Sequence, residues 1–153
     1  MIYQNLLYDV AEAVATITIN RADSYNAFSL ATLEELKAAF KAVERDAQVR
    51  AVVLTGAGKA FSSGADLVEL GANLDDVDIT GVLRSGLNTI CAQIRGLEKP
   101  VIAALNGVAA GAGASLPLAC DLRIASDKAS FVFAAFVNIG LVPDAGGTYF
   151  LAQ

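Results

Sequence analysis

Three short strand-like runs, the first two of them wholly apolar, constrain the fold of this sequence more than any other feature. They lie at residues 51–54, 101–105 and 122–125, and we interpret each as a short strand. The first has the continuous apolar character that is typical of a buried strand in a parallel sheet. A segment with helical spacing of apolar residues precedes the first run, at 30–43, and another lies between the first and second runs, at 81–97. This alternation predicts an α/β fold with crossover connections.

The N-terminal segments show the period of strands. Residues 2–10 and 13–20 alternate apolar with polar side chains, and Ala11 and Glu12 between them predict a short hairpin connection. Ser29 precedes the first helical segment and is the expected N-cap. Residues 56–66 are rich in glycine and serine and are interpreted as a loop.

Length and composition limit the function classes. The chain has 153 residues, which suits one domain, and its net charge of −5 with no basic run argues against nucleic-acid binding. It has no histidine, which excludes Ser-His-Asp and Cys-His catalysis and nearly all zinc sites, so we expect no metal. No uninterrupted apolar run reaches membrane-spanning length, and we expect a cytoplasmic protein. Cys91 and Cys120 are isolated and are expected to be reduced core residues.

Two segments share one layout, a short apolar strand followed by a loop of small residues. They are LTGAGKAFSSGAD at 54–66 and LNGVAAGAGAS at 105–115. Small side chains leave backbone N–H groups uncovered, and two such loops side by side could form an oxyanion hole. The alternative is that the glycines only allow close packing of a helix on a sheet. Neither the P-loop nor the dinucleotide-binding glycine pattern is present.

Asp144 lies between Pro143 and Ala-Gly-Gly. An acid before a helix is most often an N-cap, but a carboxylate facing an apolar pocket could instead transfer protons. Asp66 and Glu69 allow a similar structural interpretation, as the start of a helix with a favourable dipole interaction.

Four blocks together resemble the crotonase (enoyl-CoA hydratase/isomerase) superfamily. They are NRADSYNAFSLATLEEL, AVVLTGAGKAFSSGADL, KPVIAALNGVAAGAGASLPLACDLRIAS and IGLVPDAGGT, in the order of the family and covering essentially the whole chain. The resemblance implies a spiral of repeated ββα units and an acyl-CoA thioester as ligand, with coenzyme A as part of the substrate and no other cofactor. It also implies homotrimers or dimers of trimers. Residues 1–153 would be the N-terminal spiral domain, without the family's C-terminal helical region.

The resemblance also assigns candidate site residues. The family's two oxyanion donors are backbone N–H groups, which here fall on Ala65 and Ala112. Further candidates for contact with coenzyme A or substrate lie in the SSGAD block and in the loop before the first helix: Ser63, Ala65, Asp66, Leu67, Ala22 and Ala27.

Departures from the family pattern bear on the reaction. At the positions of the two glutamates that hydratases use, this sequence has Ser115 and Phe136, which together with Leu141 are further candidates for contact with the substrate. The third acid position of the family, used by several isomerases and a dehalogenase, carries Asp144, and the LVPDAGGT block looks most like ring-epoxide isomerases of phenylacetyl-CoA degradation and Δ3,Δ2-enoyl-CoA isomerases. We therefore predict an isomerase in which Asp144 moves a proton, in an apolar pocket formed by Phe133, Phe136 and Leu141.

Two other functions stay open at this point. Asp144 could act as a nucleophile on an aryl-CoA, as in dehalogenases. The chain could also be a non-catalytic acyl-CoA-binding relative. Because relatives in the superfamily are about a hundred residues longer, we expect the chain to expose apolar surface and to associate in solution.

Overall fold

The computed structural model describes residues 2–70, 78–138 and 140–152. Its first strands, β1 (Leu6–Ala11) and β2 (Val14–Ile19), form an antiparallel hairpin. The turn falls on Glu12 and Ala13, which both have positive φ, so the predicted connection is displaced by one residue. β1 also begins later than the predicted segment 2–10, because alternation of side chains continues beyond the residues that pair with β2.

The predicted apolar runs form the larger sheet together with this hairpin. β3 (Ala51–Gly56), β5 (Val101–Leu105) and β7 (Leu122–Ala125) follow β2 in the strand order β1-β2-β3-β5-β7. Every pair from β2 to β7 is parallel. The prediction of an α/β fold with crossover connections is confirmed.

A smaller parallel sheet lies in segments that carried no strand signal. β4 (Ala60–Ser62), β6 (Val108–Ala110) and β8 (Ser130–Val132) pair in the order β4-β6-β8. The interpretation of residues 56–66 as a continuous loop is therefore wrong. A strand of three residues is too short to show a period of two, and only pairing with its neighbours defines it.

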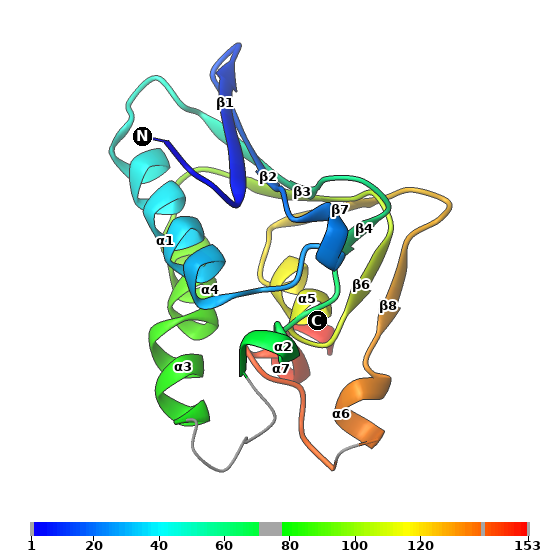
Figure 1. Ribbon diagram of the computed structural model, residues 1–153. Coiled ribbons are helices and arrows are strands. Elements are labelled where there is room, and N and C mark those ends of the chain that lie inside the picture. The colour runs from blue at the N-terminus through cyan, green and yellow to red at the C-terminus, as the bar shows by residue number, and fades with distance from the viewer. Residues whose placement is uncertain (1, 71–77, 139, 153) are drawn as a thin grey trace.

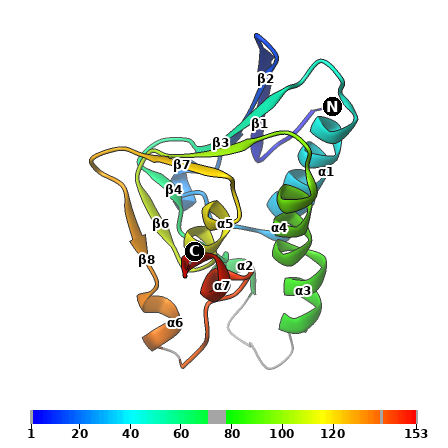
Figure 2. The same ribbon diagram turned by 180° about the vertical axis from the view of Figure 1, so that it is seen from behind.

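The two sheets arise from one repeated winding. β3 leads to β4, β5 to β6, and β7 to β8, so each turn places one strand in each sheet. The second and third turns are followed by α5 (Ala112–Leu118) and α6 (Ala134–Asn138). The ββα spiral implied by the resemblance is confirmed, and Figures 1 and 2 show its strands stacked in succession beside the helices.

Long helices line one side of the molecule. α1 (Leu30–Arg45) begins at the predicted N-cap Ser29, whose side chain accepts a hydrogen bond from the N–H of Thr32. The predicted helix over 81–97 is divided into α3 (Ile79–Ser85) and α4 (Leu87–Gly96). Gly86 separates them, and a Cβ there would lie 2.6 Å from the carbonyl oxygen of Val82, so only glycine fits this break. Both views place α1, α3 and α4 opposite α6 (Figures 1 and 2).

The main core lies between these helices and the larger sheet. Its largest fully buried side chains include Ile17 and Leu54 from the sheet and Leu36, Phe40 and Ile90 from the helices. Among the described residues, no helix is both long enough and apolar enough to cross a membrane.

Large apolar side chains are exposed along the C-terminal third of the chain. Examples are Leu122 and Ile124 on β7, Val137 on α6, and Leu141 and Val142. The predicted association in solution would cover such a surface, and it stays a prediction.

Candidate active site

Two loops that follow strands meet at Gly64 and Ala112. The backbone at Gly64 has φ +92°, and a Cβ there would lie 2.7 Å from the carbonyl oxygen of Ala110 and 3.1 Å from the nitrogen of Ala112. Gly111 has φ +53° and immediately precedes α5. The SSGAD loop is also joined to the loop before α1 by a bridge between Phe28 and Ala65. The structure therefore brings the two glycine-rich loops together, as the sequence predicts.

The N–H groups of Ala65 and Ala112 are available to a ligand. Ala112 is the first residue of α5, so its N–H has no acceptor within the helix. Neither N–H donates to another backbone oxygen in the part of the chain that the structure describes. The flanking N–H of Asp66 donates instead to the carbonyl of Phe28, at 3.1 Å. Both groups can thus donate to an oxygen, although their role as oxyanion donors is a prediction.

Both alanines and Asp144 line one pocket of about 50 Å³. Its other walls are mostly apolar and come from the loop before α1, from α1, α3 and α4: Phe28, Leu30, Leu33, Val82, Leu83 and Leu87. Since a cavity of about 10–15 Å³ already holds one water, the pocket has room for a small reacting group. Glu69 at the end of α2 (Leu67–Leu70) also contributes to the lining.

The apolar wall differs from the one that sequence analysis suggested. Phe136 is buried and stacks on Phe133, with ring centroids 6.3 Å apart, and Leu141 is exposed. None of the three belongs to the residues that line the pocket beside Asp144. Residues on α1, α3 and α4 and in the loop before α1 line it instead.

Asp144 is half-buried and does not act as a helix cap. The N-cap of α7 (Gly147–Leu151) is Gly146, and no side chain caps this helix. Burial raises the pKa of the Asp144 carboxyl above its ordinary value of 3.8, while the neighbouring Ser115 hydroxyl lowers it to a smaller extent. A carboxyl with a raised pKa in an apolar pocket is suited to accepting and returning a proton.

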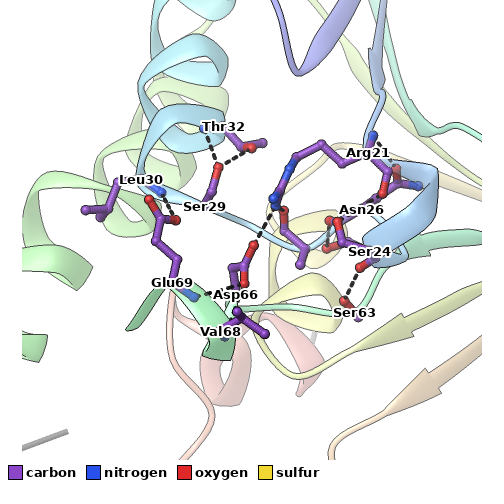
Figure 3. Close-up of polar contacts among 12 residues, drawn as sticks. Arg21, Ser24, Asn26, Ser29, Leu30, Thr32, Ser63, Asp66, Val68 and Glu69 are labelled. Carbon is purple, nitrogen blue, oxygen red and sulfur yellow. Dashed lines mark hydrogen bonds and ion pairs between the residues drawn. The ribbon is translucent and has the colours of Figure 1, made fainter. Parts of the chain in front are cut away.

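Asp66, by contrast, forms hydrogen bonds and an ion pair that hold neighbouring segments together (Figure 3). Its Oδ2 pairs with Nη1 of Arg21 at 2.8 Å, and its Oδ1 accepts from the N–H groups of Val68 and Glu69 at the start of α2. Hydrogen bonding from Arg21 is the largest effect and lowers the pKa of Asp66 below its ordinary value. Asp66 thus caps α2 and ties the SSGAD loop to the loop before α1.

The remaining predicted contact residues lie around this junction. Ala22, Ser63 and Leu67 are exposed, and the Ser63 hydroxyl donates to the carbonyl of Ser24 at 3.2 Å (Figure 3). Ala27 is buried, so its side chain has little area to offer a ligand. Their contacts with coenzyme A stay predictions.

Sequence reasoning missed the residues that hold the two loops in place. Arg21 donates to the carbonyl of Ala27 at 2.6 Å as well as to Asp66. Asn26 is fully buried, and its amide donates to the carbonyls of Ala57 and Ala60 at 2.8 Å. A buried asparagine has no periodic signature, because its partners come from loops distant in sequence.

The sequence pattern around Glu69 indicates only the start of a helix. Its Oε2 accepts from the N–H of Leu30 at 2.9 Å, which connects α2 to the beginning of α1 (Figure 3). This bond is available because the first N–H groups of a helix have no intrahelical acceptor. The contact spans 39 residues and leaves no signal in local sequence.

Comparisons to known proteins agree with the fold. The family model described as enoyl-CoA hydratase/isomerase matches residues 9–153. The chain belongs to this family.

Individual relatives carry different activities in their names. The chain is 39% identical to the trans-2-decenoyl-[acyl-carrier-protein] isomerase of Streptococcus mutans, with 100% of this chain and 59% of that protein aligned. It is 42% identical to the 1,2-epoxyphenylacetyl-CoA isomerase of Escherichia coli, with 97% and 57% aligned. It is 44% identical to a probable enoyl-CoA hydratase of Rhodobacter capsulatus, with 100% and 58% aligned. The chain therefore spans less than three fifths of the length of these relatives.

A solved structure gives the same result for the fold. The putative enoyl-CoA hydratase/isomerase of Legionella pneumophila superposes with a TM-score of 0.87 at 35% identity. The alignment covers 97% of this chain and 57% of that one. The crotonase fold implied by the resemblance is confirmed for this chain.

Proposed function

We propose that this chain binds an acyl-CoA thioester and isomerises it through an enolate, with Asp144 as the acid and base. The observation that carries the proposal is the single pocket lined by Ala65, Ala112 and Asp144. It combines two backbone N–H groups with a half-buried carboxyl in apolar surroundings. Coenzyme A enters as part of the substrate, and the chemistry requires no other cofactor.

The first part of the mechanism is charge stabilisation. The thioester carbonyl oxygen accepts hydrogen bonds from the N–H groups of Ala65 and Ala112. When a proton leaves the adjacent carbon, the electron pair of the broken C–H bond moves into the C–C bond, and negative charge develops on the oxygen. Fixed N–H donors stabilise that charge, and each donor of this kind contributes about 10²–10³-fold in rate.

Asp144 performs the proton transfer. Its carboxylate takes the proton from carbon and returns it to another carbon of the conjugated system, so the double bond moves and the enzyme is regenerated. One base is sufficient for this shift. The raised pKa supports the role, because a more basic carboxylate is a better acceptor for a carbon-bound proton.

Hydration would require a further group to hold and activate water. The resemblance places the two hydratase glutamates at Ser115 and Phe136, neither of which is an acid. Glu69 is a second carboxylate in the pocket wall, but its Oε2 is bonded to the N–H of Leu30. These features favour proton transfer over water addition.

The test is incorporation of solvent deuterium into a 3-enoyl-CoA, followed by mass spectrometry. We expect exchange by the parent chain, and loss of exchange in Asp144→Asn with thioester binding nearly unchanged. Ser126→Ala, an exposed substitution away from the pocket, is the control and should exchange like the parent. Full exchange by Asp144→Asn would show that another group moves the proton. A covalent adduct on Asp144, detected by mass, would indicate a nucleophilic role instead.

A further inference from the structure

Two buried polar atoms beside the pocket have no hydrogen-bond partner in the described part of the chain. They are Oγ of Ser115 and Oδ1 of Asp144. Ser115 is fully buried on α5, so water cannot reach its hydroxyl in this conformation. An unsatisfied buried polar group is costly, and two of them near each other require an explanation.

The hydroxyl of Ser115 does not take the bond that a helical serine usually forms. The nearby carbonyl of Gly111 accepts instead from the N–H groups of Ala114 and Ser115, at 2.9 and 3.2 Å. The hydroxyl lies against the turn that carries Asp144. A Cβ added to Gly147 would lie 2.9 Å from Ser115 Oγ, and the Gly147 N–H donates to the carbonyl of Asp144 at 2.7 Å. Glycine at 147 therefore allows the turn to approach the hydroxyl closely.

The two atoms are chemically complementary. A serine hydroxyl has one proton to donate, whereas an ionised carboxylate only accepts. One hydrogen bond between them would satisfy both groups. The described conformation does not bring the two atoms into hydrogen-bond geometry, although the Ser115 hydroxyl is near enough to lower the pKa of Asp144, and catalytic hydrogen bonds commonly shorten only when substrate binds.

We propose that Ser115 is a positioning residue, whose hydroxyl donates to Asp144 Oδ1 and leaves Oδ2 to exchange the proton with substrate. This inference rests on the proposed function of Asp144. The bond fixes one oxygen of the carboxylate, which keeps the other free for substrate in the pocket that Ala65 and Ala112 also line. It also favours the ionised form, which offsets part of the effect of burial and keeps the base able to accept a proton near neutral pH.

Other groups near Asp144 act on it in different ways. Cys91 on α4 is close enough for the Asp144 charge to raise the pKa of its thiol, which burial already raises, to about 12. Cys91 therefore stays neutral and does not compete as a charged partner. Glu69 lines the same pocket, but its Oε2 accepts from the N–H of Leu30. Ser115 is the neighbour that supplies a donor.

The decisive measurement is an NMR titration of the aspartate carboxyl carbons in the 153-residue chain. The Asp144 signal is assigned by its loss in Asp144→Asn. We expect Ser115→Ala to raise the pKa of Asp144, because the donor to its charged form is removed, and Ser115→Cys to raise it less, because a thiol is a weaker donor of similar size. Cys120→Ala is the matched control, since it removes one heavy atom from a buried position just beyond the same helix.

Activity gives a second readout. In the deuterium-exchange assay, Ser115→Ala should lower kcat about tenfold with little change in KM, and should move the acidic limb of the pH profile to higher pH. Partial recovery is expected in Ser115→Cys. A merely structural role would change stability without moving the titration of Asp144.

The outcomes separate this inference from the proposed function. If the parent exchanges and Asp144→Asn does not, while Ser115→Ala matches the parent in rate and in the pKa of Asp144, the inference is overturned and the proposed function stands. If the parent shows no exchange, the proposed function fails, and the titration alone decides whether Ser115 donates to Asp144. If Ser115→Ala does not fold, the Ser115→Cys titration decides, and an unchanged pKa overturns the inference.

Discussion

Replacing Gly64 with alanine adds one methyl group, which should push the two candidate oxyanion loops apart. A Cβ at residue 64 would lie 2.7 Å from the Ala110 carbonyl oxygen and 3.1 Å from the Ala112 nitrogen, both of them backbone atoms. Backbone atoms cannot rotate away as a flexible side chain can, so Gly64→Ala must move one loop. The φ of +92° adds backbone strain for any residue with a Cβ.

The expected cost follows from these two contributions. Left-handed backbone strain costs about 1–2 kcal/mol, and overpacking of a tight site costs about 1–3 kcal/mol. Together they lower the free energy of unfolding by about 3 kcal/mol. For a chain of this size, that change should lower the thermal midpoint by about 6–12 °C. Because the N–H groups of Ala65 and Ala112 would no longer converge, deuterium exchange should fall about a hundredfold.

Gly140→Ala is a control that distinguishes the effect of backbone strain from the effect of steric overlap. Gly140 also has positive φ, +72°, but nothing lies within 4 Å of a Cβ built there. This control should lose only about 1 kcal/mol in stability. Urea unfolding followed by circular dichroism measures both variants. If Gly64→Ala were no less stable than Gly140→Ala, close apposition of the two loops would be refuted.

Two further predictions concern charge and thiol chemistry. Because Arg21 holds the pKa of Asp66 below its ordinary value of 3.8, their pair stabilises the fold above that pH and is lost as the pH falls through the lowered value. Asp66→Asn, which retains a capping side chain, should lower the free energy of unfolding by about 1 kcal/mol at pH 7, as measured by urea unfolding. The difference in stability between variant and parent should vanish in strong acid, and a difference that stays constant with pH would contradict this prediction. Burial raises the pKa of the Cys91 and Cys120 thiols to about 12. Neither thiol should therefore react with a thiol reagent at pH 8 until the chain unfolds. Rapid labelling of the folded chain would contradict this prediction, because it would show that the thiols are accessible.

Much of the fold was predictable because its signals are local. The apolar run that begins at Ala51 and the capping of α1 by Ser29 each depend on a few consecutive residues. The smaller sheet was not predictable in this way. β4 has three residues, and its existence depends on pairing with β6, which lies more than 40 residues later.

In the candidate site, too, some features could be predicted from the sequence and others could not. The resemblance selected Ala65, Ala112 and Asp144, and the structure places all three on one pocket. The apolar wall was predicted from Phe136 and Leu141, which are near Asp144 in sequence, but α1, α3, α4 and the loop before α1 supply it. Proximity in sequence was a poor guide there, because crossover connections bring distant helices against the loops.

The sequence by itself determined the family, the alternation of strands and helices, and the presence of two loops with uncovered N–H groups. These properties follow from residue type and local spacing. Only the tertiary structure decided that Arg21 and Asn26 hold the loops together, that burial raises the pKa of Asp144, and that Ser115 lies unpartnered beside it. Burial and hydrogen-bond partnership are properties of surroundings, and those surroundings come from segments that only folding brings into contact.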